Sequence, residues 1–234
     1  MTAALELQGV SSGYGEALVL RELDLTVQPG EIFTLLGKNG MGKSTLLKTI
    51  MGYLPVRSGR VLVAGDETTG SAPHRVARRS VAYTPQERAL FQDLTLAENL
   101  QLVMSDTKGV EAGLDRIAAW FPVLRDRLHQ RAGTLSGGEQ KMLLMARAIL
   151  PKAKLMLIDE ISEGLQPTMV TAVVNMLKAE RRSRSMAVLL VEQNVPFAFS
   201  LADRFAVLKR GEIVARGSVS DQDARAVVEA HLSI

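Results

Sequence analysis

The sequence predicts an α/β fold with a mainly parallel central sheet. Three observations support this prediction. Helical and strand patterns alternate from residue 136 to the C-terminus, as in parallel sheets covered by helices. Apolar residues make up 47% of the 234-residue chain but aromatic residues only 4%, which indicates an aliphatic core. A glycine-rich loop lies between an apolar strand at 31–36 and a helix at 44–51.

Composition excludes several classes of protein. The chain has no cysteine, so neither disulfides nor thiolate metal sites can form. No apolar run approaches the roughly 18 residues of a membrane-spanning helix. Residues 1–6 lack the basic and then apolar layout of a secretory signal. The net charge of +3 is too small to indicate nucleic acid as a partner, and we expect a cytoplasmic protein.

Two alternating segments precede the glycine-rich loop. Residues 5–10 and 23–27 have the pattern of half-buried strands, with a loop at 11–15 between them and a turn at 28–30. These segments predict an N-terminal antiparallel β meander. Farther along, the pattern predicts strands at 60–63, 80–84, 154–158, 186–191, 204–208 and 212–215, helices at 136–150, 168–180 and 221–232, one more helix after Asn194, and turns at 58–59 and 210–211.

Residues 94–133 show no strand pattern and predict a helical insertion. Thr95 can cap a helix at 96–100, and a second helix is expected at 110–121. Pro122 breaks the pattern before a short third helical piece.

The glycine-rich loop, Gly37–Thr45, matches the pattern G-x-x-x-x-G-K-S/T at every fixed position. Such a loop aims backbone N–H groups and the positive end of a helix dipole at one point, which suits a polyphosphate. Gly40 and Gly42 would let the backbone come close to it. Lys43 would reach the β- and γ-phosphates, and the Ser44 hydroxyl would ligate Mg²⁺.

Two further segments carry chemistry. An apolar strand delivers Asp159 and Glu160 at its C-terminal end, where ligands of open α/β sheets bind. We expect Asp159 to hold Mg²⁺ and Glu160 to polarise the water that attacks the γ-phosphate. The segment Leu135–Gln140 places a cap residue and two glycines at a helix N-terminus, a second anion-binding device. One nucleotide needs only one such device, so the second indicates a nucleotide held by another chain.

In this order, the motifs closely resemble those of the ATP-binding cassette (ABC) family of P-loop NTPases over essentially the whole chain. The resemblance implies a single ABC ATPase domain at 1–234 with a helical subdomain at 94–133. The nucleotide-binding residues that it implies are Tyr14, Gly37, Asn39, Gly40, Met41, Gly42, Lys43, Ser44, Thr45, Ser136, Gly137, Gly138 and Glu139. The implied catalytic residues are Glu160, Lys43, Gln193 and Gln86, and the implied Mg²⁺ ligands are Ser44, Gln86 and Asp159.

The family resemblance also implies partners. Two ATPase chains of that family pair head to tail, each nucleotide lying between the Walker A loop of one and the Ser-Gly-Gly of the other, and they bind two transmembrane permease subunits. A narrower resemblance, to ATPases of importers for branched-chain amino acids and for urea or short amides, is carried by Leu190–Asn194, Glu163–Pro167, Leu54–Gly59 and the compact insertion. It implies a different ATPase chain as partner, a periplasmic solute-binding protein acting indirectly, and a peripheral location on the cytoplasmic face of the inner membrane. We expect branched-chain amino acids to be the transported substrate, although the residues at Glu163–Pro167 and Gly40–Lys43 resemble the urea branch more.

Besides Glu139, which takes the usual glutamine position of the signature loop, three residues depart from the family pattern. Gln193 stands where the wider family has a switch histidine, Gln166 where it has an aspartate, and Ile161 where it has a proline. The site built on this chain's own loops is therefore expected to hydrolyse ATP more slowly than the partner's. A non-catalytic nucleotide-binding subunit and a soluble ABC ATPase of non-transport function stay as alternatives. Phe91 is expected either in the core or in contact with the membrane subunits.

Overall fold

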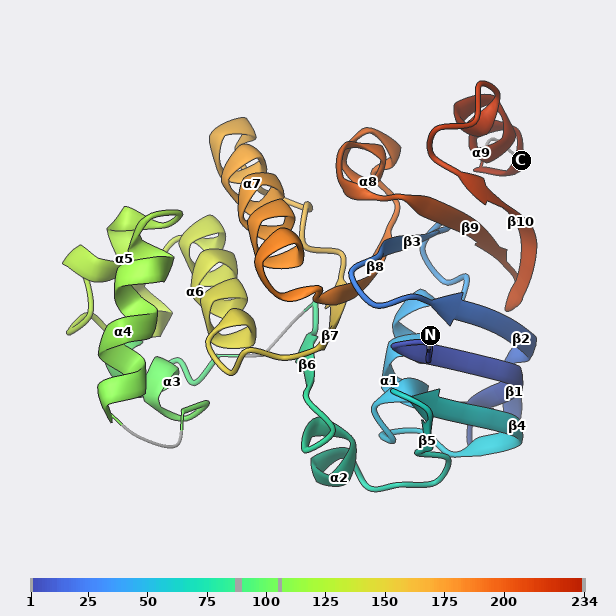
Figure 1. Ribbon diagram of the computed structural model, residues 1–234, viewed down its shortest axis with the longest axis horizontal. Helices are drawn as coiled ribbons and strands as arrows, with labels where there is room; N and C mark the ends of the chain where they lie inside the picture. Colours follow the sequence, from blue (N-terminus) through green and yellow to red (C-terminus); the bar gives the residue numbers. More distant parts are fainter. Residues whose placement is uncertain (1, 87–89, 105–106, 233–234) are drawn as a thin grey trace.

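Two β-sheets and the helices around them make up the computed structural model, which describes residues 2–86, 90–104 and 107–232 (Figure 1). The strands are β1 (Leu5–Tyr14), β2 (Ala17–Val27), β3 (Ile32–Leu36), β4 (Val56–Val63), β5 (Asp66–Glu67), β6 (Val81–Thr84), β7 (Leu155–Asp159), β8 (Ala187–Glu192), β9 (Arg204–Lys209) and β10 (Glu212–Ser218). The helices are α1 (Lys43–Ile50), α2 (Pro73–Ala77), α3 (Leu96–Gln101), α4 (Thr107–Ala118), α5 (Pro122–Asp126), the 3-10 turn η1 (Ala132–Thr134), α6 (Gly137–Ile149), α7 (Pro167–Arg184), α8 (Val195–Leu201) and α9 (Ala224–Leu232).

The predicted mainly parallel sheet is confirmed. Its strand order is β10-β9-β3-β8-β7-β6, with β10 antiparallel at one edge and parallel pairing throughout the rest. The second sheet, β2-β1-β4-β5, is antiparallel. It contains the predicted N-terminal pair of strands and is completed by two strands that follow the glycine-rich loop.

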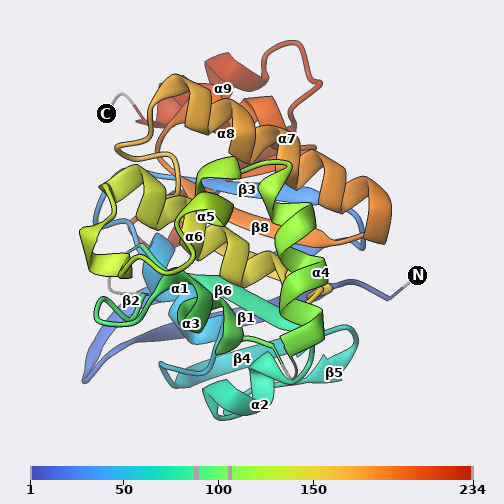
Figure 2. The ribbon, with the colours of Figure 1, turned by 90° about the vertical axis from the view of Figure 1, so that its left-hand side faces the viewer.

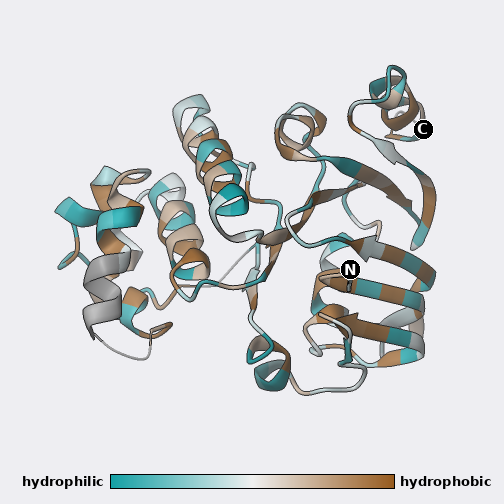
Figure 3. Ribbon diagram, in the orientation of Figure 1, coloured by the Kyte–Doolittle hydropathy of each residue, from teal (hydrophilic) through white to brown (hydrophobic). Residues whose placement is uncertain are grey.

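Burial explains why the central strands are continuous apolar runs. Every residue of β3, β7 and β8 is buried, because helices α6 to α8 cover one face of the parallel sheet, while α1 and the antiparallel sheet cover the other (Figure 2). Figure 3 shows these strands as mostly hydrophobic, whereas α6 and α7 alternate between hydrophobic and hydrophilic residues. Because β3, β6, β7, β8 and β9 run parallel to one another, their carboxyl ends lie at one edge of the sheet.

The sequence predicted a loop at 11–15. This prediction is wrong for residues 11–14, because strand β1 continues to Tyr14. The composition there is that of a loop, but tertiary polar contacts hold it as a strand. Ser12 is fully buried; its Oγ donates to the carbonyl oxygen of Pro55 (2.8 Å) and accepts from Thr49 Oγ1 (2.9 Å). Buried partners for a small polar side chain thus override local propensity.

The turn expected at 58–59 is also wrong, since β4 passes through it. Gly59 has a φ of +84°, and a Cβ on it would lie 2.3 Å from the carbonyl oxygen of Gly9. A glycine here serves a distorted strand pairing with β1 rather than a turn. The other predicted helices and strands are present with shifted ends, and α2 and β5 were not predicted.

Helices α3 to α5 gather at one side of the molecule (green in Figures 1 and 2). Thr95 caps α3 as predicted, within a capping box completed by Glu98, and Pro122 stands at the first turn of α5. Ser136 and Glu139 form the same box at the start of α6. Within the described ranges, no helix combines the length and apolarity that crossing a bilayer requires.

Candidate active site

The loop Gly37–Thr45 leaves the end of β3 and leads directly into α1. The Gly37 N–H donates to the carbonyl oxygen of Glu192 (3.2 Å), which ties the loop to the neighbouring strand β8. Gly42 has a φ of +105°, and a Cβ on it would lie 2.9 Å from a methyl carbon of Leu20. Both the backbone conformation and the packing therefore favour glycine at this position.

A hollow of about 420 Å³ lies in front of this loop. It is lined by Val19, Asn39, Gly40, Gly42, Lys43, Ser44, Thr45, Gln86 and Glu160. The loop after β3, the carboxylate after β7 and the amide after β6 thus share one cavity at the carboxyl edge of the parallel sheet. Its volume lies in the range of small-molecule sites, about 300–1,000 Å³.

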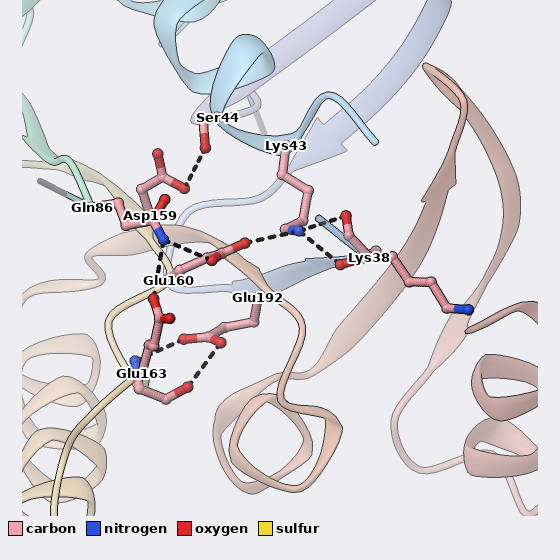
Figure 4. A network of polar contacts seen from close by, with 10 residues as sticks. Lys38, Lys43, Ser44, Gln86, Asp159, Glu160, Glu163 and Glu192 are labelled. Atoms are coloured by element: carbon pink, nitrogen blue, oxygen red, sulfur yellow. Dashed lines mark hydrogen bonds and ion pairs between the residues drawn. The ribbon is translucent and has the colours of Figure 1, made fainter. Parts of the chain in front are cut away.

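The Lys43 ammonium stands at the centre of the polar network (Figure 4). Its side chain is buried, and Nζ donates to the carbonyl oxygens of Gly37 (2.7 Å) and Lys38 (2.9 Å). It also forms an ion pair with Glu160 Oε1 at 2.8 Å. A buried charge needs such partners, so a phosphate that binds here must replace oxygens that the protein itself supplies.

Ser44 and Asp159 lie together beside this ion pair (Figure 4). Ser44 Oγ donates to Asp159 Oδ1 at 3.0 Å. Burial raises the pKa of Asp159 to about 6; the Ser44 hydrogen bond opposes this shift and the Glu160 carboxylate adds to it. The spacing fits Mg²⁺, because octahedral ligands about 2.1 Å from the ion are about 3 Å apart, and proteins usually give Mg²⁺ one or two ligands beside substrate phosphates.

Glu160 is held by contacts from several directions. Its backbone has a φ of +46°, in the left-handed region, which costs a non-glycine residue about 1–3 kcal/mol. Gln86 Nε2 donates to Glu160 Oε2 and to Glu163 Oε2, both at 3.1 Å. Together with the ion pair to Lys43, these contacts fix the Glu160 carboxylate just after the C-terminal end of β7.

Glu192 and Ser162 form a contact that sequence reasoning missed. The Glu192 side chain is buried; Oε1 accepts from the Ser162 N–H (3.0 Å) and Oε2 from its hydroxyl (2.9 Å). Burial raises the pKa of Glu192, and the hydrogen bonds from Ser162 oppose the shift. Glu192 ends an apolar strand as Asp159 does, which is a usable signal, but its partner lies 30 residues away in sequence.

Several predicted nucleotide residues are not among the described residues that line the hollow. Tyr14 lies at the tip of the β1–β2 hairpin with 47% of its surface exposed, and Gln193 is exposed just after β8. Ser136 and Gly137 are exposed at the N-terminus of α6. The structure therefore separates a phosphate hollow, built on β3, β6 and β7, from a second exposed helix start.

Residues 20–163 match the sequence model of the family described as ABC transporter. The chain belongs to the ABC transporter family. The match contains the phosphate loop, the Ser-Gly-Gly segment and the two carboxylates at the end of β7, Asp159 and Glu160. As an ABC ATPase, the chain binds and hydrolyses ATP.

Individual relatives resemble the chain over most of its length. It is 41% identical over 212 residues to "High-affinity branched-chain amino acid transport ATP-binding protein BraG" of Pseudomonas aeruginosa, covering 90% of this chain and 91% of the relative. It is 36% identical over 214 residues to "Probable branched-chain amino acid transport ATP-binding protein LivF" of Archaeoglobus fulgidus, covering 91% of each. A solved structure of an ATP-binding subunit of an ABC transporter is 28% identical, with a TM-score of 0.85 and coverage of 96% and 94%.

Proposed function

We propose that this chain is the ATP-hydrolysing subunit of an importer for branched-chain amino acids. The observation that carries this proposal is the 41% identity to BraG over about nine tenths of both chains. LivF, the second relative, has a name of the same kind. The chemistry of the hollow agrees with this role, because it gathers a phosphate loop, a lysine and a carboxylate at one edge of the sheet.

ATP hydrolysis would use the residues of the hollow as follows. Backbone N–H groups of Gly40–Thr45 and the Lys43 ammonium bind the phosphates, so that Lys43 exchanges Glu160 for phosphate oxygens. Ser44, Asp159 and Gln86 would hold Mg²⁺, which when bound neutralises charge on the phosphate oxygens. Glu160, released from Lys43, accepts a hydrogen bond from the attacking water.

In this proposal, a second ATPase chain completes the two nucleotide-binding sites. Ser136 and Gly137, which are exposed, and Gly138 and Glu139, which are half-buried, form a helix start that suits the phosphates of a nucleotide bound by the partner. Tyr14 and Gln193 lie outside the hollow of the single chain, and we assign them to the adenine and to the γ-phosphate of the assembled site. The partner is a different ATPase chain, and 94–133 is the helical subdomain of a single domain, 1–234.

The permease subunits are assigned to a large apolar groove of about 890 Å³. We call it the α2–α6 groove; its lining includes Tyr53, Ala77, Tyr83, Phe91, Leu144 and Arg147. Tyr53 and Phe91 are 58% and 55% exposed. Exposed aromatic side chains around an apolar groove suit a partner that places the chain on the cytoplasmic face of the inner membrane. The periplasmic binding protein acts only through these permeases.

Transport by the whole complex tests the proposal. The chain is reconstituted in liposomes with the permeases, second ATPase and binding protein encoded beside it, and uptake of labelled leucine, urea and acetamide is measured. We expect ATP-dependent leucine uptake. Uptake of urea or acetamide without leucine would assign the chain to the amide importers instead, and ATP hydrolysis that never supports uptake would favour a non-transport ATPase.

The Glu160→Gln variant tests the hydrolytic part. It should keep ATP bound and lower turnover at this chain's site by at least about 100-fold, the contribution typical of a general base. Glu163→Gln is the matched control, since Glu163 accepts from the same Gln86 amide but has no assigned role in hydrolysis. Normal turnover of Glu160→Gln at this site would remove Glu160 from its assigned role, whereas no turnover at this site even in the wild-type chain would make the chain a non-catalytic partner.

A further inference from the structure

The main chain that follows β7 is held by a lysine from helix α6. Lys141 Nζ donates to the carbonyl oxygens of Glu160 (3.4 Å), Ile161 (3.3 Å) and Glu163, the last by a short contact. These carbonyls belong to one turn of chain that begins at the carboxylate of the active site. A single ammonium therefore gathers the backbone that carries Glu160.

The setting of Lys141 indicates a specific contact rather than a surface charge. The side chain is partly buried, and burial lowers the pKa of its ammonium, while the carboxylates of Glu163, Glu192 and Glu160 oppose that shift. A desolvated ammonium is stable only where oxygens replace its water, and the three carbonyls do so.

The backbone at Glu160 is of the kind that needs such support. Its left-handed φ of +46° persists only where the surroundings fix it. Lys43 and Gln86 hold the side chain of Glu160, but both are expected to change partners when phosphate and metal bind. Lys141 holds the main chain instead and has no other assigned role, so it can keep the residue in place throughout the reaction.

We infer that Lys141 is a positioning residue for ATP hydrolysis, which fixes the main chain of Glu160 from helix α6. The inference rests on the proposed function, because it requires Glu160 to act on the attacking water. A positioning role for Lys141 would also couple the two nucleotide sites of the assembled pair. Helix α6 is capped by Ser136, which is assigned to the partner's nucleotide, and Lys141 stands on the second turn of the same helix. A small shift of α6 on closure would therefore reach the carboxylate of this chain's own site.

The test compares Lys141→Met with Lys154→Met in the assembled complex. Lys154 is an exposed lysine just before β7 and serves as the matched control. Because this chain's own site is expected to be the slower of the two, rates are measured with the partner's site inactivated. Under that condition we expect Lys141→Met to lower kcat about tenfold or more, with KM and the affinity for a fluorescent ATP analogue within about twofold of wild type. The control should leave all three unchanged. If Lys141→Met folds and its kcat stays within twofold of wild type, the inference is wrong.

Lys141→Arg keeps the charge and protects the test against a folding defect. The N–H donors of its guanidinium lie in one plane, so they cannot converge on the three carbonyl oxygens as those of an ammonium do. We therefore expect kcat to fall at least about threefold, with wild-type affinity and melting temperature. A wild-type kcat for this variant would also contradict the inference.

A double variant separates positioning from a general structural role. In a Glu160→Gln background, Lys141→Met should leave the residual single-turnover rate unchanged, because the group that it positions is already inactive. A further tenfold loss would show that Lys141 acts elsewhere. If the wild-type complex hydrolyses no ATP, or Glu160→Gln has no effect, the proposed function fails; if only Lys141→Met is silent, the inference alone fails.

Discussion

Asp159 combines deep burial with a charge that the fold does not fully compensate. The residue is only 2% exposed, and burial raises its pKa from 3.8 to about 6. Between these values the folded chain binds more protons than the unfolded chain, so stability falls as pH rises through this window and stays lowered above it. A shift of about two units corresponds to about 2–3 kcal/mol.

Replacing Asp159 should therefore stabilise the metal-free protein while damaging its function. In urea unfolding with a chelator present, we expect Asp159→Asn to raise the free energy of unfolding by about 1–3 kcal/mol at pH 7.5 and about half as much at pH 5. Asp93→Asn, at an exposed site, should change it by less than about 0.5 kcal/mol at either pH. A gain that does not depend on pH would contradict the burial argument.

The residues of the site were predictable to the extent that their signals are local. Lys43, Ser44, Asp159 and Glu160 lie in contiguous motifs, and the structure brings all four to one hollow or to its immediate neighbour. Lys141 carries no local signal, and although Glu192 ends an apolar strand as Asp159 does, its partner Ser162 cannot be read from the sequence, because these partners come from other parts of the chain. Such contacts exist only once α6, β7 and β8 are packed together.

At the scale of elements, α3 and α6 begin with the same device. The Thr95 and Ser136 hydroxyls each accept from the backbone N–H three residues on, and the carboxylates of Glu98 and Glu139 accept from the backbone N–H of the cap residue. The two caps should contribute equally to stability, at about 1 kcal/mol each. Only the cap of α6 is assigned to a nucleotide.

Removing the two caps should separate stability from catalysis. Thr95→Ala and Ser136→Ala are each expected to lower the free energy of unfolding by about 0.5–2 kcal/mol. Ser136→Ala alone should also lower the ATPase rate of the assembled complex, because the partner's nucleotide loses a contact. Equal ATPase rates for the two variants would mean that the Ser136 hydroxyl contributes only to the helix.

The elements themselves were predictable where polarity follows burial. Buried runs such as β7 and β8 have no polar interior, and helices α3, α6 and α8 begin after capping residues that are visible in the sequence. The stretch 11–14 was missed because its serines are buried with polar partners from α1 and the loop before β4. The strand order is set by packing between distant segments, so sequence could give parallel strands but not the neighbours of β3.

At the scale of the whole molecule, the α2–α6 groove joins α6 to the first helices of the chain, and the described residues that line it include none of those that line the hollow. Phe91 stands in its lining, and the Arg147 guanidinium lies 5.7 Å from the centre of its ring. This contact orients an aromatic side chain that is still more than half exposed, at 55%. Of the two roles expected for Phe91, exposure favours contact with a partner over the core.

Phe91→Ala should weaken the association with the permeases and leave nucleotide binding intact. Truncation of an aromatic anchor typically costs more than 1 kcal/mol, so we expect at least about fivefold less ATPase chain in pull-downs with the permeases. Leu102→Ala is the matched control, because Leu102 has the same 55% exposure but is not among the described residues that line the groove. Equal losses for both variants would contradict the assignment of the groove.

Strands β3, β7 and β8 are buried along their whole length. The phosphate loop follows β3, Asp159 ends β7 with Glu160 directly after it, and Glu192, whose carboxylate binds Ser162, ends β8. The reacting groups thus have no hinge of their own. On heating, we expect ATPase activity and the tertiary structure of the parallel sheet to be lost together, in one cooperative unfolding transition.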